Sequence, residues 1–574
     1  MNTALHGRIV LFGILIVLAP AWAVTGHGIT RLTLHSHLSL RPGHAAIASA
    51  NALATRAGFS VLDKGGNAFD AAVAMAAMLS VVEPESSGLG GGFFAILHLA
   101  REHRNVFLDA REVAPAAVHS RDYASRDGSI KLDTALKGPL SAAIPGEPAG
   151  LVWLSRHYGR LPLKVALAPA IRAANQGFKP GARLLGVIKD QEQSLRRWPA
   201  SAAKFLPAGR LPLPGKLIRD PNQARTLKWL AAKGNAGFYH GEVAKKLVNA
   251  VRKAGGNWTL ADLAHYRVKE RKPVTIHYHG YRIVTVAPPS SGGVTLAEMF
   301  NILSGYKLGK MDQAHRAHYM VEAMRRAYRD RNDYLGDPDF VKMPLSMLQS
   351  AYYAAGLRAS ILPDKATPST MLPHGLTDRS IIHSTTHFSI IDHDGNMIAL
   401  TSSLNYYLGS NFVAKGTGIV LNDTMDDFAL VPGKSNAYGL TGSKANAPQG
   451  GKRPLSSMSP SIVFGPKRTL VIGSPGGATI ITQVLEGTLH FIHGQHARTL
   501  VSDKRFHDQF LPDMVFVENG TFNAATSASL KKMGYTLKLR KPWGAENVVI
   551  WNRKTNKLDA ASDPRRVNGL AIVQ

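Results

Sequence analysis

Two threonines stand side by side in "STTHFS", residues 384–389, where a polar segment gives way to an apolar run. A hydroxyl without a neighbouring base is a poor nucleophile at neutral pH. If the peptide bond before Thr385 were cut, the freed α-amine, with an ordinary pKa of about 7.7 to 8.0, would supply that base. Threonine also commonly opens a strand because it is β-branched. We therefore interpret Thr385 as a candidate nucleophile and Thr386 as a strand residue.

The surroundings of Thr385 suit a cut. Residues 363–384 are polar and contain three prolines, as expected of an exposed connector in which cleavage is tolerable. Residues 387–403 then predict a β-hairpin, with its turn at residues 394–396. The first strand of this hairpin would hold the new terminus rigidly.

Two other segments carry residues of chemical interest. "KRPLSSMSPS" places Ser456 and Ser457 side by side after a Lys-Arg pair. "VIGSPGGATIITQ" runs from a predicted strand through Gly476 and Gly477 into an apolar helix. Glycines at a helix start can offer backbone N–H groups to an oxyanion. Taken alone, however, this segment is better explained as a plain strand-to-helix turn.

Other kinds of chemistry find little support. The chain has no cysteine, which excludes disulfides, thiol nucleophiles and thiolate metal sites. Its 23 histidines form no H-E-x-x-H or comparable set with a carboxylate, so we expect neither a metal nor a cofactor. The glycines of residues 88–92 do not fit G-x-G-x-x-G and precede a strand, which argues against a dinucleotide site.

The chain is strongly basic. It has 68 lysines and arginines against 39 acidic residues, a net charge of +29, within an ordinary globular composition. The basic residues are spread along the chain and do not gather into a block. We interpret the charge as a solvated surface that favours anionic partners without identifying one, and expect no nucleic acid partner. A non-enzymatic envelope protein that binds anionic partners is the alternative, and it rests on charge alone.

The first residues have the pattern of a secretory signal. Arg8 precedes an apolar run at residues 9–18, and Ala21-Trp22-Ala23 is a small-x-small cleavage site. We expect residues 1–23 to be removed and the protein to be exported to the periplasm or the cell exterior. The run is shorter than the roughly 20 residues of a membrane span. An uncleaved signal anchor stays open as an alternative.

The remaining pattern predicts the elements that must position Thr385. Residues 45–82 predict two helices joined by a glycine turn, and residues 151–362 are mostly helical. Strands are expected at residues 93–97, 419–421, 461–464 and 470–472. Strands early and late, with helices between and after them, predict an α+β domain whose sheets draw on both halves of the chain.

A series of motifs covers nearly the whole chain after the signal. In order they are "GGNAFDAAVA", "GLGGGFFA", "LDAREVAPAA", "PPSSGG", "TTHFSIID", "DGN", "MDDF", "KRPLSSMSP", "GSPGG" and "ASDPR". In their order and spacing they resemble the γ-glutamyltranspeptidases, also called γ-glutamyltransferases or glutathione hydrolases, which are N-terminal-nucleophile hydrolases. The resemblance implies a four-layer αββα sandwich built from both subunits of a self-cleaved precursor.

The resemblance implies how the precursor is divided and what it does. Ser384–Thr385 would be the bond that the chain cuts, giving a large subunit of residues 24–384 and a small subunit of residues 385–574 that stay together as a heterodimer. Thr385 would then attack glutathione and other γ-glutamyl amides. The glutamyl group would pass to water, an amino acid or a peptide.

The resemblance also implies the roles of the binding residues. Arg111 would pair with the α-carboxylate of the substrate, assisted by Ser456 and Ser457, because an arginine fork suits that planar anion. Asp427 would meet the α-ammonium and Asn405 would contact the glutamyl group. Gly476 and Gly477 would form the oxyanion hole. Tyr438 would cover the site from a lid at residues 433–450.

The chain departs from the family pattern at two positions. Ser403 stands where the family usually has a threonine hydrogen-bonded to the nucleophile, and the hydroxyl is kept. Thr424, which we expect to be a substrate-binding residue, stands where Glu or Gln commonly lies three residues before the binding aspartate, which puts strict glutamyl selectivity in question. A cephalosporin or glutaryl acylase is the alternative enzyme, since the same scaffold serves both activities. Arg111, Asp427 and the Ser456-Ser457 pair argue against it, because a glutaryl side chain lacks the ammonium that Asp427 would meet.

Overall fold

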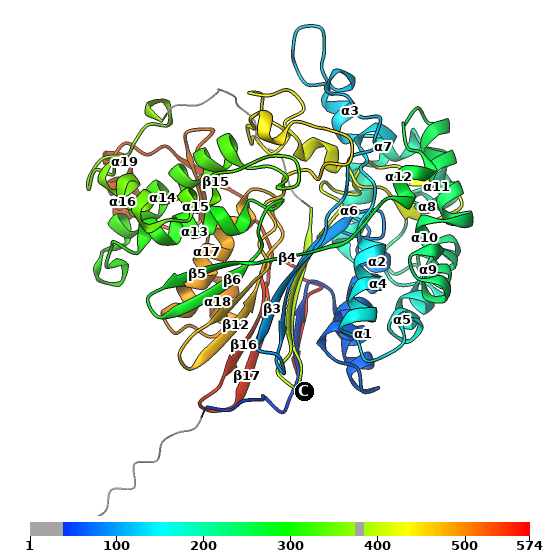
Figure 1. The fold of residues 1–574 in the computed structure, drawn as a ribbon, viewed down its shortest axis with the longest axis horizontal. Coiled ribbons are helices and arrows are strands. Elements are labelled where there is room, and N and C mark those ends of the chain that lie inside the picture. The colour runs from blue at the N-terminus through cyan, green and yellow to red at the C-terminus, as the bar shows by residue number, and fades with distance from the viewer. Residues whose placement is uncertain (1–37, 373–383) are drawn as a thin grey trace, which may run out of the picture. The chain divides into compact units, whose positions relative to one another are not determined.

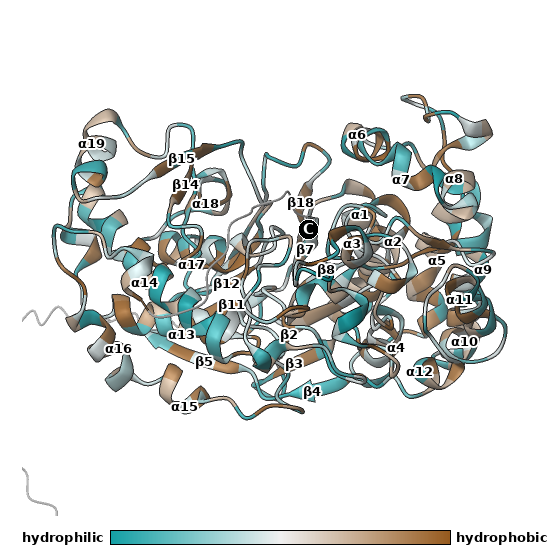
Figure 2. Ribbon diagram, turned by 90° about the horizontal axis from the view of Figure 1, so that it is seen from above, coloured by the Kyte–Doolittle hydropathy of each residue, from teal (hydrophilic) through white to brown (hydrophobic). Residues whose placement is uncertain are grey.

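The computed structural model describes residues 38–372 and 384–574. Two β-sheets lie in its centre, and helices cover the outer face of each sheet (Figures 1 and 2). The expected signal at residues 1–23 and the connector residues 373–383 lie outside the described residues. Within the described residues, no helix is long and apolar enough to cross a membrane.

The larger sheet has seven strands in the order β18-β1-β7-β8-β2-β3-β4, all paired antiparallel. Its strands are β1 (Ala46–Ser49), β2 (Gly92–Leu99), β3 (Arg104–Ala110), β4 (Lys269–Arg271), β7 (Thr386–Ile391), β8 (Met397–Ser403) and β18 (Leu570–Val573). β7 and β8 form the hairpin that the sequence predicts.

The second sheet has six antiparallel strands in the order β17-β16-β12-β11-β6-β5. They are β5 (Val274–Tyr278), β6 (Tyr281–Thr285), β11 (Ser461–Phe464), β12 (Arg468–Ile472), β16 (Asn547–Asn552) and β17 (Lys557–Ser562). Both sheets join strands from before and after residue 384, for example at the β1–β7 and β6–β11 pairs. A cut there would leave these hydrogen bonds in place.

Two small sheets complete the strands. One pairs β9 (Val413–Ala414) with β10 (Ile419–Val420), and the other joins β13 (Phe506–His507), β14 (Val515–Glu518) and β15 (Leu537–Arg540).

Helices form the two outer layers. The larger sheet is covered by α1 (Ala52–Leu62), α2 (Ala68–Val82), α4 (Glu147–His157) and α5 (Leu163–Gln176), and the other by α13 (Gly292–Leu303), α14 (Gln313–Tyr334), α17 (Thr479–Ile492) and α18 (Ala497–Ser502) (Figure 1). The other helices are α3 (Leu132–Leu136), α6 (Ala182–Asp190), α7 (Glu192–Arg196), α8 (Pro199–Phe205), α9 (Pro221–Lys233), α10 (Ala236–Tyr239), α11 (Gly241–Lys253), α12 (Leu260–Ala264), α15 (Leu345–Leu348), α16 (Ala351–Ala359) and α19 (Ala524–Lys532).

Strand β2 shows why the layers form. Its side chains alternate between the two faces of the sheet, as the pleat requires. Phe93, Ala95 and Leu97 pack into the core that includes α1 and α2, whereas Phe94 and Ile96 pack into the core shared with the second sheet, α13 and α17. All five side chains are fully buried. The four-layer αββα sandwich is therefore confirmed.

The helix pair at residues 45–82 is also confirmed, although a short strand, β1, precedes it. The turn contains Gly65, whose φ of 84° lies in the left-handed region that favours glycine. The side chain of Asn67 then caps α2 by accepting hydrogen bonds from the N–H groups of Phe69 and Asp70. This capping explains why the second helix begins directly after the glycines.

Two buried histidines tie stability to pH. Burial lowers the pKa of both His387 and His507 to about 3. An unfolded chain with an ordinary histidine pKa of about 6.5 binds more protons below that pH, so their contribution is fully present above pH 6.5 and is lost as pH falls towards 3. We expect a loss of about 1.4 kcal/mol per pH unit for each histidine in this window.

Urea unfolding at pH 7 and pH 4.5 checks this expectation. His507→Gln should make the free energy of unfolding less dependent on pH by the share of one histidine. An unchanged pH dependence in that variant would contradict the assignment.

Candidate active site

The hairpin brings Thr385 and Ser403 together. Thr386 pairs with Ser402, so Thr385 lies opposite the last residue of β8. The Thr385 Oγ1 lies 3.0 Å from the Ser403 Oγ and donates to the carbonyl oxygen of Ser384 at 2.5 Å. The Ser403 Oγ also donates to that carbonyl oxygen, at 3.2 Å. Both hydroxyls therefore lie at the peptide bond that precedes Thr385.

The structure holds this peptide bond firmly. Ser384 is fully buried, and its hydroxyl donates to the carbonyl oxygen of Glu85. The Ser403 Oγ accepts the backbone N–H of Asn405 at 2.9 Å, which fixes the position of that hydroxyl. Although the connector was expected to be exposed, its last residue is thus packed into the protein.

A narrow cavity opens beside Thr385, with about 310 Å³ of empty space. It gathers nine residues that the sequence singles out: Arg111, Thr385, Ser403, Asn405, Asp427, Tyr438, Ser456, Ser457 and Gly477. Its remaining wall is apolar and consists of Leu440, Met458, Ala478 and Ile480. Sequence reasoning missed these four, and their only signal is that each lies within three residues of a predicted site residue.

Arg111 and Asp427 form a buried ion pair in this cavity. Arg111 is 1% exposed, and its Nη2 donates to the Asp427 carboxylate. Its Nε donates to the carbonyl oxygen of Pro454 at 3.2 Å, and its Nη1 lies 3.3 Å from Glu112. Burial raises the pKa of Asp427, and the nearby Arg111 opposes that rise. One cavity therefore offers a positive and a negative group side by side.

Ser457 presents an unused hydroxyl to the cavity. The Ser457 Oγ is buried and has no hydrogen-bond partner among the described residues. The Ser456 Oγ accepts the N–H of Met458 at 3.1 Å. An unsatisfied buried hydroxyl costs about 1–3 kcal/mol, so a ligand that hydrogen-bonds to Ser457 would recover that free energy.

The two glycines before α17, Gly476 and Gly477, line two different pockets. Gly477 lines the cavity with Thr385, whereas Gly476 lines a neighbouring pocket. Gly477 has a φ of 55° and Gly476 a φ of 142°. At Gly476 a Cβ would also lie 2.5 Å from the Thr479 Oγ1. Both positions therefore favour glycine, and Gly477 brings the backbone to the cavity of Thr385.

Tyr438 lines the cavity and is held by its neighbours. Its hydroxyl donates to the Asn405 Oδ1 at 2.5 Å, and its ring stacks on Tyr406 with centroids 4.6 Å apart. The Asn405 amide in turn donates to the carbonyl oxygen of Asp423 at 3.0 Å. Tyr438 is 3% exposed, and the lid role of the segment around it stays a prediction.

Thr424 does not line this cavity. Its hydroxyl donates to the Asn422 Oδ1 at 2.6 Å, and the side chain is fully buried. Asn422 in turn donates to the carbonyl oxygens of Gly90 and Ala143. Thr424 therefore stabilises the backbone before Asp427, and its contact with substrate stays a prediction.

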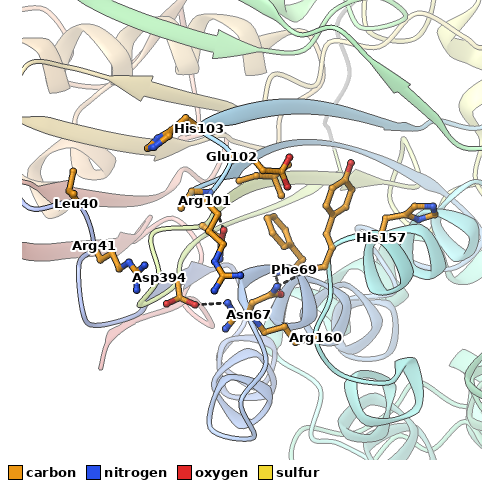
Figure 3. Close-up of a pocket in the computed structure, with 14 residues that line it drawn as sticks. Leu40, Arg41, Asn67, Phe69, Arg101, Glu102, His103, His157, Arg160 and Asp394 are labelled. Carbon is orange, nitrogen blue, oxygen red and sulfur yellow. Dashed lines mark hydrogen bonds and ion pairs between the residues drawn. The ribbon is translucent and has the colours of Figure 1, made fainter. Parts of the chain in front are cut away.

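A wider cavity, with about 1130 Å³ of empty space, has none of these residues in its lining (Figure 3). Two of its polar side chains are held by neighbouring groups. Arg160 binds Asp394 at 2.5 Å, and Asn67 donates to the carbonyl oxygen of Tyr158 at 2.7 Å. Within residues 38–372 and 384–574, no group of three or more histidines and carboxylates could hold a metal ion.

The family model of gamma-glutamyltranspeptidases matches residues 54–573. The chain belongs to this family. A glutathione hydrolase proenzyme of Pseudomonas sp. strain A14 is 39% identical over 92% of this chain and 93% of its own.

Solved structures of the family scaffold resemble the fold described above. A cephalosporin acylase from Bacillus halodurans is 25% identical, with a TM-score of 0.80, over 96% of this chain and 99% of that one. The gamma-glutamyltranspeptidase of Helicobacter pylori is 36% identical, with a TM-score of 0.55, over 56% of this chain and 93% of that one. Proteins named for different activities thus resemble this arrangement of sheets and helices.

Proposed function

We propose that this protein is a self-processing γ-glutamyltransferase and glutathione hydrolase whose nucleophile is Thr385. The observation that carries the proposal is the position of the Thr385 hydroxyl, which lies both at the Ser384 carbonyl and in the cavity that holds Arg111 and Asp427. The name glutathione hydrolase proenzyme, borne by the Pseudomonas relative, supports both the activity and a cleaved precursor.

Cleavage of the chain comes first. The Thr385 Oγ1 attacks the Ser384 carbonyl carbon, the C–N bond breaks, and the nitrogen takes up a proton to become the free α-amine. The resulting ester is opened by water, which leaves a carboxylate on Ser384. The Ser403 hydroxyl, which donates to the carbonyl oxygen, stabilises the negative charge that develops there.

Substrate cleavage then uses the new terminus. The α-amine of Thr385 accepts the proton of its own hydroxyl while Oγ1 attacks the γ-carbonyl carbon of the substrate. The N–H groups of Gly476 and Gly477 stabilise the oxyanion, and the departing amine takes the proton from the α-ammonium. Water, an amino acid or a peptide next attacks the glutamyl ester and releases Thr385.

The buried ion pair explains the choice of a glutamyl group. A substrate that carries both an α-carboxylate and an α-ammonium can exchange partners with the pair: its carboxylate binds Arg111 and its ammonium binds Asp427. Neither buried charge is then left without a counter-charge, which matters because an uncompensated buried charge costs about 3–5 kcal/mol. The Ser457 hydroxyl donates a further hydrogen bond to the carboxylate.

The acylase reading has one observation in its favour, the resemblance to the Bacillus halodurans cephalosporin acylase. A side-by-side assay of a γ-glutamyl anilide and a glutaryl anilide separates the two activities. We expect the γ-glutamyl substrate to be preferred because a glutaryl group has no ammonium to meet Asp427. A preference for the glutaryl substrate would favour the acylase.

The setting of the enzyme is also part of the proposal. The signal pattern of residues 1–23 supports export, to the periplasm or the cell exterior. After cleavage the large and small subunits, residues 24–384 and 385–574, would remain associated as a heterodimer. Strand pairs that join one subunit to the other, such as β1 with β7, support that association. No cofactor takes part in the proposed steps.

Ser403 gives a prediction about both steps. Ser403→Ala removes a hydrogen bond at the Ser384 carbonyl, so we expect cleavage of the chain and turnover to slow by about tenfold to a hundredfold. Ser403→Thr keeps the hydroxyl and should process within about threefold of the unchanged protein. Gel bands and anilide kinetics measure the two steps. Equal rates for the alanine and threonine variants would argue against this role.

A further inference from the structure

The neighbouring pocket, which Gly476 lines, is strongly basic. It has about 1080 Å³ of empty space and is lined by Arg183, Tyr407, Pro475, Gly476, Arg540, Lys541, Pro542, Trp543, Gly544, Arg565 and Arg566. Five of these eleven residues carry a positive charge, and none is acidic. The described residues that line this pocket thus form a cationic surface next to the reaction centre.

Neighbouring acids offset only part of this charge. Arg183 binds Glu85 at 2.9 Å, and Arg565 lies 2.5 Å from Glu518 and 3.1 Å from Asp563. These acids lie behind the lining and hold the two arginines in place. Glu85 is itself a weak counter-charge, because burial raises its pKa to about 7.

Two buried guanidinium nitrogens of the pocket are unused. The Arg183 Nη2 and the Arg566 Nη1 have no hydrogen-bond partner among the described residues. The acids whose charge reaches Arg566 are Glu83 and Glu85, and Arg183 opposes them with a like charge. Burial, together with this like charge, lowers the pKa of Arg566 to about 10. Buried unpaired donors of this kind are costly, and an anion that accepted a hydrogen bond from either nitrogen would offset that cost.

The chain places this pocket next to the cavity of Thr385. Gly477 and Gly476 are neighbours, yet one lines the cavity of Thr385 and the other lines the basic pocket. In the same way, Asn405 lines the cavity of Thr385 and Tyr407 lines the basic pocket. The Arg183 guanidinium lies 5.1 Å from the centroid of the Tyr407 ring. Residues 405–407 and 476–477 thus each contribute to both pockets. The two pockets therefore adjoin at Gly476 and Gly477.

We propose that this basic pocket binds the carboxylate of the peptide that leaves from the donor or attacks as the acceptor. The inference rests on the proposed function, since the glutamyl end occupies the other cavity. The amine side of the scissile bond then points out of that cavity, past Gly476 and Gly477. A peptide with a free carboxylate is held there by Arg566 and the rim residue Lys541, which orients its nitrogen towards the acyl group on Thr385.

Acceptors that differ in one charge test the proposal. The donor is a γ-glutamyl anilide, whose leaving group has no carboxylate, and the acceptors are glycylglycine and glycylglycine amide. We expect kcat/KM for glycylglycine to exceed that for its amide by about tenfold in the unchanged protein. In the Arg566→Gln/Lys541→Gln double variant the ratio should fall to about one. Added salt should reduce the ratio in the unchanged protein.

The control removes two charges elsewhere. Lys64 and Lys467 are exposed and line neither pocket, so Lys64→Gln/Lys467→Gln should keep the tenfold ratio. If the double variant fails to fold, Lys541→Gln alone, at an exposed position, should still lower the ratio by about threefold.

The outcomes separate this proposal from the proposed function. Anilide turnover with no preference for the free carboxylate overturns the carboxylate pocket alone. The same holds if the double variant keeps the preference. An absence of anilide turnover in the unchanged protein overturns the proposed function as well.

Discussion

Thr385→Ala is expected to leave the protein as a single uncut chain with γ-glutamyl turnover reduced by at least about 10³-fold. The change removes the hydroxyl that lies at the Ser384 carbonyl, so neither the cut nor the later acyl-enzyme can form. A denaturing gel and an anilide assay measure the two effects. Because Thr385 precedes β7 and forms no strand pair there, the variant should fold.

Thr385→Ser is the matched control for this variant. It keeps the hydroxyl and the future α-amine, so we expect a slower but complete cut and measurable activity. If Thr385→Ala is cut at the same bond as the unchanged protein, another group performs the cleavage and the mechanism is wrong.

Asp427→Asn should reduce kcat/KM for a γ-glutamyl anilide by roughly 10- to 150-fold, since a charge-assisted hydrogen bond contributes about 1.5–3 kcal/mol. The cause is the loss of the negative partner for the substrate ammonium. The Arg111 guanidinium keeps its hydrogen bond to the Pro454 carbonyl oxygen and its contact with Glu112. Cleavage of the chain should proceed, because Asp427 makes no hydrogen bond to Ser384 or Thr385 among the described residues.

A comparison of substrates makes this prediction specific. The variant should lose much less activity on a glutaryl anilide, which lacks the ammonium, so the preference between the two substrates should narrow. Asp133→Asn, a change to an exposed carboxylate outside the cavity, is the control and should alter neither rate. An equal loss on both substrates would mean that Asp427 acts on the fold instead of on the ammonium.

Local pattern predicted the elements around the nucleophile well. The hairpin at β7 and β8, the glycine turn after α1 and the turn before α17 each follow from residue types a few positions apart. These features depend on backbone preferences that the nearby sequence carries. The position of Thr385 directly before β7 could therefore be derived from the sequence.

Contacts between distant residues could not be derived in this way. Arg111 and Asp427 are 316 residues apart, and their direct pairing depends on how both sheets pack. The same holds for the apolar wall of the cavity and for the division of Gly476 and Gly477 between two pockets.

The most direct test of the account is intact-mass analysis of the purified, folded protein. The account predicts two chains, one ending at Ser384 and one beginning at Thr385, that separate only under denaturing conditions. A single mass that spans both residues in protein that is folded, or a cut at any other bond, would contradict the claim that Thr385 becomes a new N-terminus and the nucleophile.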